Sequence, residues 1–581
     1  MFRVALVEFK NYSFTHLGQV GGKALSNINL KFEEGTTVGI LGNAGAGKST
    51  LIKAMGGLAP VEVPGFAEGE ILIDGKDSRT LDPMSYSRMV GVVLDNPATQ
   101  LLGLTVLDDV AFGPSNLGLD VKDIRERVDF ALKVTRLKGM EARNPEELSG
   151  GQQQSLAIAD ILAMRPRVLA MDEPVSMLDA EGKDRVLSII RTLAEEKSTV
   201  VITESGLDLE SMIKYLDRLI VLNKGEVFLD GKPMDVMADM GLDKIGVGRT
   251  QLAELFMKLR GVSEIREIPE SIERAAEILS PRISGMRFSN NREVATIPPP
   301  GDGASSPAVN VKNLQHMFPP DVHALRGVDV SIARGEIVGL IGQNGSGKTT
   351  LCLHLVGVLK PTNPEASIVV CDLNVLKARF HDIIKKINYV FQNPDNQLFQ
   401  ETIMHELTYG LRLQNFDPEL IIPEAARVSK EFELDSYVQD DMDALPREVK
   451  TILAMASVMT LKPSVLVLDE PANAMDRIRA AWFIDKLKSL NKSTGLTVIV
   501  VSHNMELLAK LCTRLIVMTD GKVVLEGETR KVFAQPEKLA EAKVKPPQIT
   551  QLAQLLSKQG FPNDVLTADE FFNLIHPEVA K

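Results

Sequence analysis

A nine-residue glycine-rich motif occurs twice in the chain, and this repeat constrains the fold more than any other feature. The motif reads GNAGAGKST at 42–50 and GQNGSGKTT at 342–350. Each copy follows a short apolar run that predicts a buried strand, and a second apolar run ending in Asp-Glu-Pro comes a little over a hundred residues later. The glycine motifs are 300 residues apart (342 minus 42) and the Asp-Glu pairs 297 apart (469 minus 172). We therefore interpret the chain as a duplication of one architectural module.

The glycine motif predicts binding of nucleotide phosphates. Its glycines allow a tight turn that aims backbone N–H groups at phosphate oxygens, and the following helix N-terminus adds a positive dipole end. The lysine is expected to reach the β- and γ-phosphates, and the hydroxyl residue after it to bind Mg²⁺. The predicted ATP-binding residues are Gly42, Asn43, Gly45, Gly47, Lys48, Ser49 and Thr50 in the first copy and Gly342, Asn344, Gly345, Gly347, Lys348, Thr349 and Thr350 in the second.

The two Asp-Glu pairs predict the rest of the phosphate chemistry. Asp172 and Asp469 end apolar strands, where a carboxylate can hold Mg²⁺ together with Ser49 or Thr349. Glu173 and Glu470 come next in the sequence and are placed to orient or deprotonate an attacking water. The sequence thus predicts two modules that bind ATP and Mg²⁺.

A third motif narrows the class of protein. LSGGQ at 148–152, together with DEPVSMLD at 172–179, resembles the signature of ABC ATPases. This resemblance implies an α/β fold with two tandem P-loop ABC ATPase domains, each with a RecA-like core, an antiparallel β subdomain and a helical subdomain, followed by short helical extensions. In that family the signature completes the nucleotide site of the opposite domain. We therefore expect Ser149, Gly150, Gly151 and Gln152 to contact ATP.

The two halves differ at the motifs that the family uses. The second signature reads LPREV at 445–449 and lacks both glycines. Three further positions differ. The Q-loop residue is Gln392 in the second half and Asp95 in the first, and the switch residue is His503 in the second half and Glu204 in the first. The residue expected to stack on adenine is Phe318 in the second half, and His16 occupies that position in the first. The resemblance implies one consensus and one degenerate composite site. The residues expected to act in catalysis are Glu470, His503, Gln392 and Glu173, with Gln392 also expected to bind Mg²⁺.

The segments after the Q-loops suggest the kind of transporter. QNPDNQLFQETIMHELTYGL from Gln392 and DNPATQLLGLTVLDDVAFGPSNLGL from Asp95 are similar to the ATPase subunits of energy-coupling factor importers, the cobalt, nickel and vitamin group. This resemblance implies an ATPase motor at the cytoplasmic face of the membrane, with a membrane coupling subunit and a substrate-binding membrane subunit as partners. We expect exposed docking residues among Leu101, Leu102, Leu398 and Phe399.

Composition shifts divide the chain further. We predict ATPase domains at 1–235 and 309–532, helical extensions at 236–288 and 533–581, and a linker rich in Pro, Gly, Ser and Asn at 289–308. Apolar residues at helical spacing recur in the two extensions, at Leu252, Leu255 and Phe256 and at Leu552, Leu555 and Leu556. These stripes either cover their own domain or pair with each other or across a dimer.

Composition also excludes several classes. Three cysteines without metal-like spacing argue against a disulfide framework, a zinc site and an iron–sulfur cluster. No apolar run reaches the length of a membrane span, and the charged start MFRVALVEFK argues against a signal peptide. A net charge of −12 predicts no nucleic-acid partner. Two alternatives stay open, namely a soluble tandem ABC protein acting on ribosomes or in DNA repair, and the tandem ATPase of a sugar importer.

Overall fold

The computed structural model describes residues 5–18, 22–175, 178, 180–206, 209–284, 286, 288, 306–319, 321–442, 445–473 and 475–576. Contacts divide the chain into a first unit, Met1–Ala275 with Asp476–Ile478, and a second unit, Ala276–Met475 with Arg479–Lys581. Most of the predicted linker, at 289–305, and three residues of DEPVSMLD, at 176, 177 and 179, lie outside the described residues.

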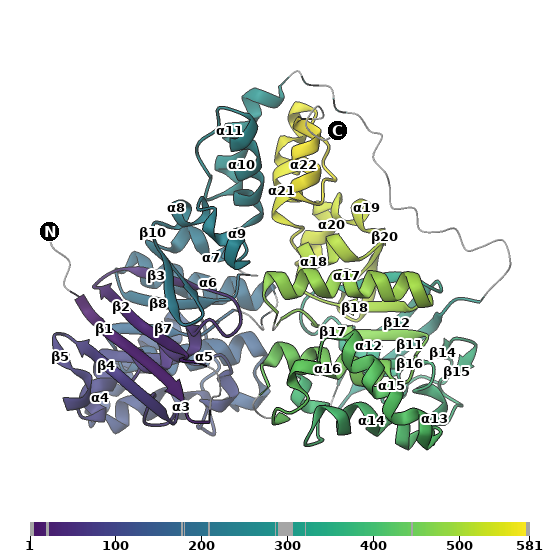
Figure 1. Cartoon of the computed structure of the whole chain (residues 1–581), viewed down its shortest axis with the longest axis horizontal. Coiled ribbons are helices and arrows are strands. Elements are labelled where there is room, and N and C mark those ends of the chain that lie inside the picture. Colours follow the sequence, from purple (N-terminus) through teal and green to yellow (C-terminus); the bar gives the residue numbers. More distant parts are fainter. Residues whose placement is uncertain are drawn as a thin grey trace. The chain divides into compact units, whose positions relative to one another are not determined.

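The first unit contains two sheets and a layer of helices (Figure 1). A four-stranded antiparallel sheet has the order β2-β1-β4-β5, with β1 (Ala5–His16), β2 (Leu25–Glu33), β4 (Gly65–Ile73) and β5 (Lys76–Asp77). A six-stranded sheet has the order β10-β9-β3-β8-β7-β6, with β3 (Thr37–Leu41), β6 (Val90–Val93), β7 (Val168–Met171), β8 (Thr199–Glu204), β9 (Arg218–Asn223) and β10 (Glu226–Gly231). The helices are α1 (Lys48–Met55), α2 (Pro83–Met89), α3 (Val106–Asn116), α4 (Val121–Val134), α5 (Gly150–Ala163), α6 (Ala180–Glu195), α7 (Leu209–Met212), α8 (Pro233–Met237), α9 (Gly241–Ile245) and α10 (Gln251–Val262).

The second unit repeats this topology. Its antiparallel sheet has the order β12-β11-β14-β15, with β11 (Val309–Phe318), β12 (Val322–Ile332), β14 (Ser367–Val370) and β15 (Leu373–Asn374). Its larger sheet has the order β16-β17-β18-β13-β19-β20, with β13 (Ile337–Ile341), β16 (Ile387–Val390), β17 (Val465–Asp469), β18 (Thr497–Val501), β19 (Arg514–Thr519) and β20 (Lys522–Glu528). The helices are α12 (Lys348–Leu355), α13 (Phe380–Ile383), α14 (Ile403–Leu413), α15 (Pro418–Glu431), α16 (Arg447–Met459), α17 (Arg477–Thr494), α18 (Met505–Leu511), α19 (Thr529–Phe533), α20 (Pro536–Glu541), α21 (Gln548–Leu555) and α22 (Ala568–Ile575), and α11 (Ile272–Ile283) crosses the division between the units.

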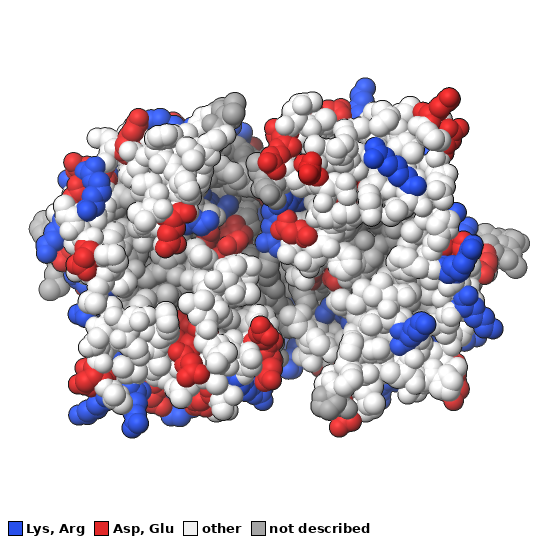
Figure 2. Space-filling view, turned by 90° about the horizontal axis from the view of Figure 1, so that it is seen from below, with Lys and Arg blue, Asp and Glu red and all other residues white. Residues whose placement is uncertain are grey.

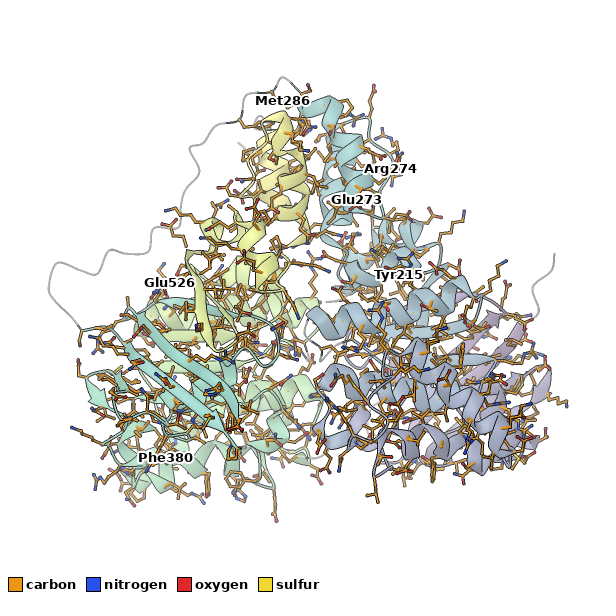
Figure 3. The ribbon with its side chains drawn as sticks, turned by 180° about the vertical axis from the view of Figure 1, so that it is seen from behind. Tyr215, Glu273, Arg274, Met286, Phe380 and Glu526 are labelled. Carbon is orange, nitrogen blue, oxygen red and sulfur yellow. The ribbon has the colours of Figure 1, made fainter. Side chains whose placement is uncertain are left out.

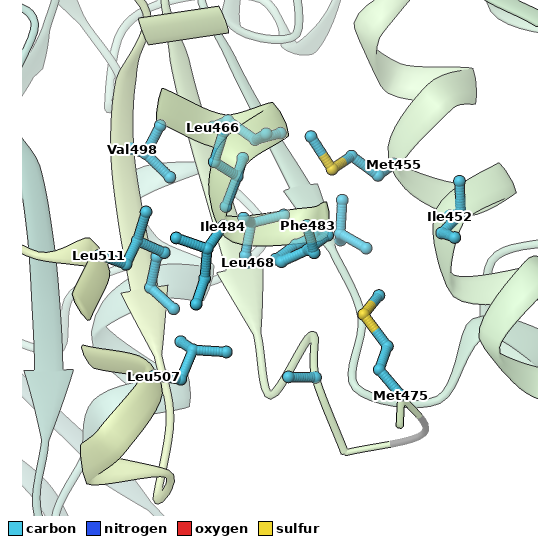
Figure 4. Packing of buried hydrophobic residues seen from close by; sticks show 14 of the residues in the cluster. Ile452, Met455, Leu466, Leu468, Met475, Phe483, Ile484, Val498, Leu507 and Leu511 are labelled. Carbon is cyan, nitrogen blue, oxygen red and sulfur yellow. The ribbon is translucent and has the colours of Figure 1, made fainter. Parts of the chain in front are cut away.

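The central strands read as continuous apolar runs because helices cover both faces of a parallel sheet. All residues of β13, β17 and β18 are buried. Figure 4 shows side chains from α16, β17, α17, β18 and α18 meeting in one cluster, with Phe483 of α17 near its centre. The sheets, the helical layer and their repeat confirm the expected fold class.

The larger sheet of the second unit ends in an antiparallel edge strand. β20 alternates exposed and half-buried residues, as expected for a strand with one face toward solvent. Arg514 of β19 donates to Glu526 of β20 at 2.9 Å, and Glu526 lies on this edge in Figure 3. Charged side chains on an edge strand discourage pairing with another chain.

The extension helices follow the predicted apolar pattern with one exception. Leu252, Leu255 and Phe256 of α10 are buried, as is Leu552 of α21. Leu555 is 48% exposed, so the predicted stripe is wrong at this position. α21 ends there and a 3₁₀ turn, Leu556–Gln559, follows, so the angle between successive side chains changes. Within the described ranges, the structure has no helix of the length and apolarity needed to cross a membrane.

Candidate functional site

The glycine motif of the first unit connects β3 to α1 and forms a tight loop around its lysine. Lys48 Nζ donates to the carbonyl oxygens of Gly42 at 2.8 Å and Asn43 at 3.3 Å. Gly47 precedes α1 with a φ of 100°, and a Cβ there would lie 2.6 Å from the carbonyl oxygen of Ala24. Only glycine fits this conformation and this close approach. The loop is therefore closed by contacts with its own backbone.

A cavity of about 610 Å³ opens beside this loop. Its lining includes His16, Lys48, Ser49 and Thr50, four residues at positions predicted to meet ATP. The lysine and the backbone N–H groups at the start of α1 suit an anionic phosphate chain. This cavity therefore fits the group that the sequence predicts.

The second unit forms the same loop between β13 and α12. Lys348 Nζ donates to the carbonyl oxygens of Gly342 at 2.7 Å and Gln343 at 2.9 Å. Thr349 Oγ1 donates to Asp469 Oδ2 at 3.2 Å. The hydroxyl and the carboxylate predicted to hold Mg²⁺ therefore lie together, which is the oxygen ligand set that Mg²⁺ prefers.

In the first unit the acid pair is tied to Lys48 and to β8. Asp172 Oδ1 accepts a hydrogen bond from Thr203 Oγ1 at 2.5 Å, and Glu173 Oε1 lies 3.6 Å from Lys48 Nζ. Burial raises the pKa of Asp172 and of Glu173. Lys48 lowers the pKa of Glu173 and so opposes the effect of burial. Glu173 is thus an ion-pair partner of the lysine predicted to bind phosphate.

In the second unit the corresponding glutamate has further partners, and Lys348 opposes the effect of burial on its pKa just as Lys48 does for Glu173. Glu470 Oε2 accepts a hydrogen bond from Ser502 Oγ at 3.1 Å, and Glu470 Oε1 lies 3.5 Å from His503 Nε2. Burial and the neighbouring Asp469 raise the pKa of Glu470 to about 7. A carboxylate poised near neutral pH beside an imidazole suits proton transfer to or from a water.

The predicted switch and Q-loop residues differ in placement. His503 Nε2 lies 3.2 Å from Asn344 Oδ1, so the structure brings His503, Asn344 and Glu470 together. Glu204 ends β8 as a buried residue whose Oε1 accepts from the backbone N–H of Gly206 at 3.1 Å. Gln392 is exposed in the loop after β16, and among the residues that the structure describes no hydrogen bond joins it to Asp469.

The two predicted adenine positions carry aromatic pairs in opposite order. His16 contacts Phe14 edge to face at 5.0 Å, and Phe318 contacts His316 in the same way at 4.5 Å. His16 Nε2 lies 3.1 Å from Thr50 Oγ1, within hydrogen-bond distance. Burial and Lys53 lower the pKa of His16, so its imidazole is neutral near pH 7. The first unit thus presents a polar ring where the second presents the phenyl ring of Phe318.

The two signatures begin helices with different caps. Ser149 caps α5, because its Oγ accepts from the backbone N–H of Gln152 at 3.4 Å while its own N–H donates to Gln152 Oε1 at 3.0 Å. A Cβ at Gly150 would meet no atom within 4 Å, so the helix end is open to an anion. α16 instead begins after Pro446 without a side-chain cap. Only the first signature therefore has the geometry expected of a phosphate-binding helix start.

The segments that follow the Q-loops are fixed by buried carboxylates. Asp109 Oδ1 accepts from the backbone N–H groups of Leu102 and Gly103, both at 3.0 Å. Glu406 Oε2 accepts in the same way from Phe399 at 3.2 Å, and also from the N–H of the next residue. The side chains of Leu102 and Phe399 are 69% and 62% exposed. Leu398 is buried and Leu101 half-buried, so two of the four predicted docking residues are available for a partner.

Sequence reasoning missed the hydroxyl residues that position the acidic pairs. Thr203 and Ser502 each precede the switch residue, and Tyr389 lies three residues before Gln392. The signal was present, because each is a hydroxyl at or beside an otherwise apolar buried strand. A buried polar group of this kind needs a hydrogen-bond partner.

Comparisons with known proteins show the family of this chain. The ABC transporter family model matches residues 25–176 and 325–473. A protein of Methanosarcina mazei named "Putative ABC transporter ATP-binding protein" is 37% identical over 96% of this chain and 95% of its own length, and one of Caldanaerobacter subterraneus is 32% identical over 94% and 96%. Among solved structures, cbiO1 from Clostridium perfringens, part of the ABC transporter complex cbiONQ, is 28% identical over 43% of this chain and 99% of its own, with a TM-score of 0.38. The chain therefore belongs to the ABC transporter family, and it is a tandem ATPase with two ATP-binding domains.

Proposed function

We propose that this ATPase is the motor of a membrane importer of the energy-coupling factor type, and that the second unit's glycine motif belongs to the site that carries the turnover. The importer assignment rests on the resemblance of the segments that follow Gln392 and Asp95. The observation that carries the assignment of turnover is the difference between the two glutamates that follow Asp172 and Asp469. Glu470 is held by Ser502 and lies beside His503, whereas Glu173 lies against Lys48.

At the second site, the residues divide the chemistry among them. Lys348 and the N–H groups of its loop hold the phosphates of ATP, and Thr349 and Asp469 hold Mg²⁺. Mg²⁺ supplies charge neutralisation at the phosphate oxygens when it is bound. Glu470 accepts a proton from the attacking water, and His503 orients that water or the terminal phosphate. Gln392 is assigned to the same site by its place after β16.

At the first site, the same parts are arranged to bind rather than to hydrolyse. Lys48 and Ser49 are retained beside the cavity. A carboxylate at the switch position, Glu204, stands where the second unit has the imidazole of His503, so an ionised side chain there cannot donate a hydrogen bond to the terminal phosphate. Glu173 pairs with Lys48, and the switch position next to it in space carries the carboxylate of Glu204 where the second unit has an imidazole. We propose that this site holds ATP with little turnover.

The remaining assignments follow from the family resemblance and are part of the same proposal. We assign Ser149, Gly150, Gly151 and Gln152 to contacts with ATP, because α5 begins with an open, capped N-terminus. Phe318 is assigned to adenine stacking. The domain limits 1–235, 236–288, 289–308, 309–532 and 533–581 are proposed as the division of the chain.

The exposed apolar residues support a protein partner for the post-Q-loop segments. Phe399 contacts Tyr409 edge to face at 4.7 Å, and Glu406 fixes its backbone, so its exposed ring is held in place and not free to fold inward. Figure 2 looks onto the side of the second unit that carries α14 at the bottom of Figure 1. Basic and acidic side chains are interspersed there with broad uncharged areas, without a basic patch among the residues drawn in colour. This surface suits an amphipathic protein helix better than a nucleic acid.

The test is co-purification of the chain with membranes from cells that also produce the membrane proteins encoded by the neighbouring genes. The double variant Phe399→Asp, Leu102→Asp is expected to lower the amount of chain recovered with the membrane fraction about tenfold. The reason is that a charge buried at an apolar anchor costs more than about 1 kcal/mol of binding free energy. The control is Val524→Asp, at an exposed valine of β20. Nucleotide binding is expected to be unchanged in all variants. Sedimentation of the unaltered chain with ribosomes, or its absence from the membrane fraction, would refute the importer proposal and favour the soluble alternative.

A further inference from the structure

The metal-binding aspartate of the second unit has a second hydroxyl partner besides Thr349. Tyr389 OH donates to Asp469 Oδ2 at 2.5 Å, and Thr349 Oγ1 donates to the same oxygen at 3.2 Å. Tyr389 is 8% exposed and lies on β16, next to β17 in the sheet. Because Tyr389 pairs with Val467 in this register, its side chain points to the same face as Asp469, two residues further along β17.

The first unit lacks this contact. The residue of β6 that corresponds to Tyr389 is Val92, which pairs with Ala170 just as Tyr389 pairs with Val467. There Thr203 donates to Asp172 from β8, on the opposite side of β7. In the second unit the residue at this place is Ser502, and it donates to Glu470 instead. In the second unit, then, the aspartate accepts from Tyr389 and the glutamate accepts from Ser502.

We propose that Tyr389 is a positioning residue for the Mg²⁺ site of the second unit. Its hydroxyl fixes the orientation of the Asp469 carboxylate. Because Oδ2 accepts hydrogen bonds from two donors, the carboxylate cannot rotate freely, and this sets the direction in which Oδ1 points. A partner behind a metal ligand fixes that ligand's orientation in many metal sites, and its loss typically costs 10–100-fold in metal affinity. The inference rests on the proposed assignment of Asp469 as a Mg²⁺ ligand.

Tyr389 also lies on β16, the strand that leads to Gln392 and the segment after it. Its ring contacts Phe391 edge to face at 4.8 Å, and the N–H of Phe391 donates to Gln397 Oε1 at 3.3 Å. Gln397 Nε2 in turn donates to the carbonyl oxygen of Ala454 on α16 at 2.9 Å. The end of β16 is therefore held by the contact between the rings of Tyr389 and Phe391 and by the hydrogen bonds of Gln397. A fixed backbone suits a residue that orients a carboxylate.

The test measures how much Mg²⁺ the second site needs in order to bind nucleotide. The whole chain carries Lys48→Ala, so that binding of a fluorescent ATP analogue reports on Lys348 and its site. In Mg²⁺-buffered solution, Tyr389→Phe is expected to raise the Mg²⁺ concentration at half-maximal binding about tenfold. Binding in EDTA and the melting temperature are expected to be unchanged, because phenylalanine fills the same volume. The matched control, Tyr409→Phe on α14, is expected to behave like the unaltered chain.

Two results would overturn the inference. One is a half-maximal Mg²⁺ concentration for Tyr389→Phe within twofold of the control, and the other is an equal loss of binding in EDTA. An Asp469→Asn variant separates this failure from a failure of the proposed site. If Asp469→Asn keeps the Mg²⁺ dependence of the control, the assignment of Asp469 is wrong. If Asp469→Asn loses that dependence while Tyr389→Phe keeps it, only the role of Tyr389 is wrong.

Discussion

The unequal partners of the two glutamates predict unequal effects of the same substitution. Glu470→Gln removes the carboxylate that Ser502 holds and that lies 3.5 Å from His503. A positioned general base contributes about 10²–10⁴ to a rate. We therefore expect Glu470→Gln to lower steady-state ATP hydrolysis by at least about a hundredfold, which is about 2.7 kcal/mol of transition-state stabilisation.

The same change in the first unit acts on a different interaction. Glu173→Gln removes the ion pair with Lys48 at 3.6 Å and frees the lysine for phosphate. Because we assign little turnover to this site, the rate is expected to change by less than about threefold. ATP binding there is expected to stay the same or to tighten, since Lys48 no longer shares its charge.

The assay is phosphate release at saturating ATP, measured on the whole chain together with the membrane subunits proposed as its partners. Binding of a fluorescent ATP analogue to each variant confirms that neither change removes nucleotide binding. The double variant is expected to equal Glu470→Gln alone. Similar losses in the two single variants would refute the asymmetry, and so would a larger loss for Glu173→Gln than for Glu470→Gln.

Three further predictions concern the signature, the base and a buried acid. Ser149→Arg blocks the open start of α5 and is expected to lower hydrolysis at least about tenfold, whereas Arg447→Ala in the degenerate signature is expected to change it less than about twofold; equal effects would contradict the assignment. Ser502→Ala removes one hydrogen bond to Glu470 and is expected to lower hydrolysis about tenfold without weakening ATP binding, a result that phosphate release and binding assays separate. Burial and Asp109 raise the pKa of Asp160 well above its usual range, so the folded chain holds this proton more tightly than the unfolded one and loses stability as pH rises through the raised pKa. Asp160→Asn is therefore expected to raise the free energy of unfolding of the first unit by about 1 kcal/mol or more at pH 8, which corresponds to about 2–4 °C in melting temperature. The gain is expected to be smaller at pH 5. Equal shifts in melting temperature at both pH values, measured by scanning calorimetry, would contradict this.

Local sequence alone determined the elements whose chemistry lies within a few consecutive residues. The loop around Lys48 closes on carbonyl groups only five and six residues away. The glycine at position 47 by itself indicates the left-handed backbone conformation found there. The start of α5 is equally local, because Ser149 and Gln152 cap each other across one turn. The repeat spacing then predicted the fold class of both halves, since a buried parallel strand before each loop is required by the motif itself.

Only the tertiary structure decided which hydroxyl meets which carboxylate. Asp172 and Thr203 are 31 residues apart, and Tyr389 and Asp469 are 80 apart, so no local pattern connects them. The first contact depends on the pairing of β7 with β8 and the second on the pairing of β16 with β17, and non-local packing sets the order and register of these strands. The same holds for Leu102 and Phe399, whose exposure follows from the buried carboxylates of Asp109 and Glu406 holding the backbone beside them. The motifs name the reacting groups, but strand neighbours decide how each group is held.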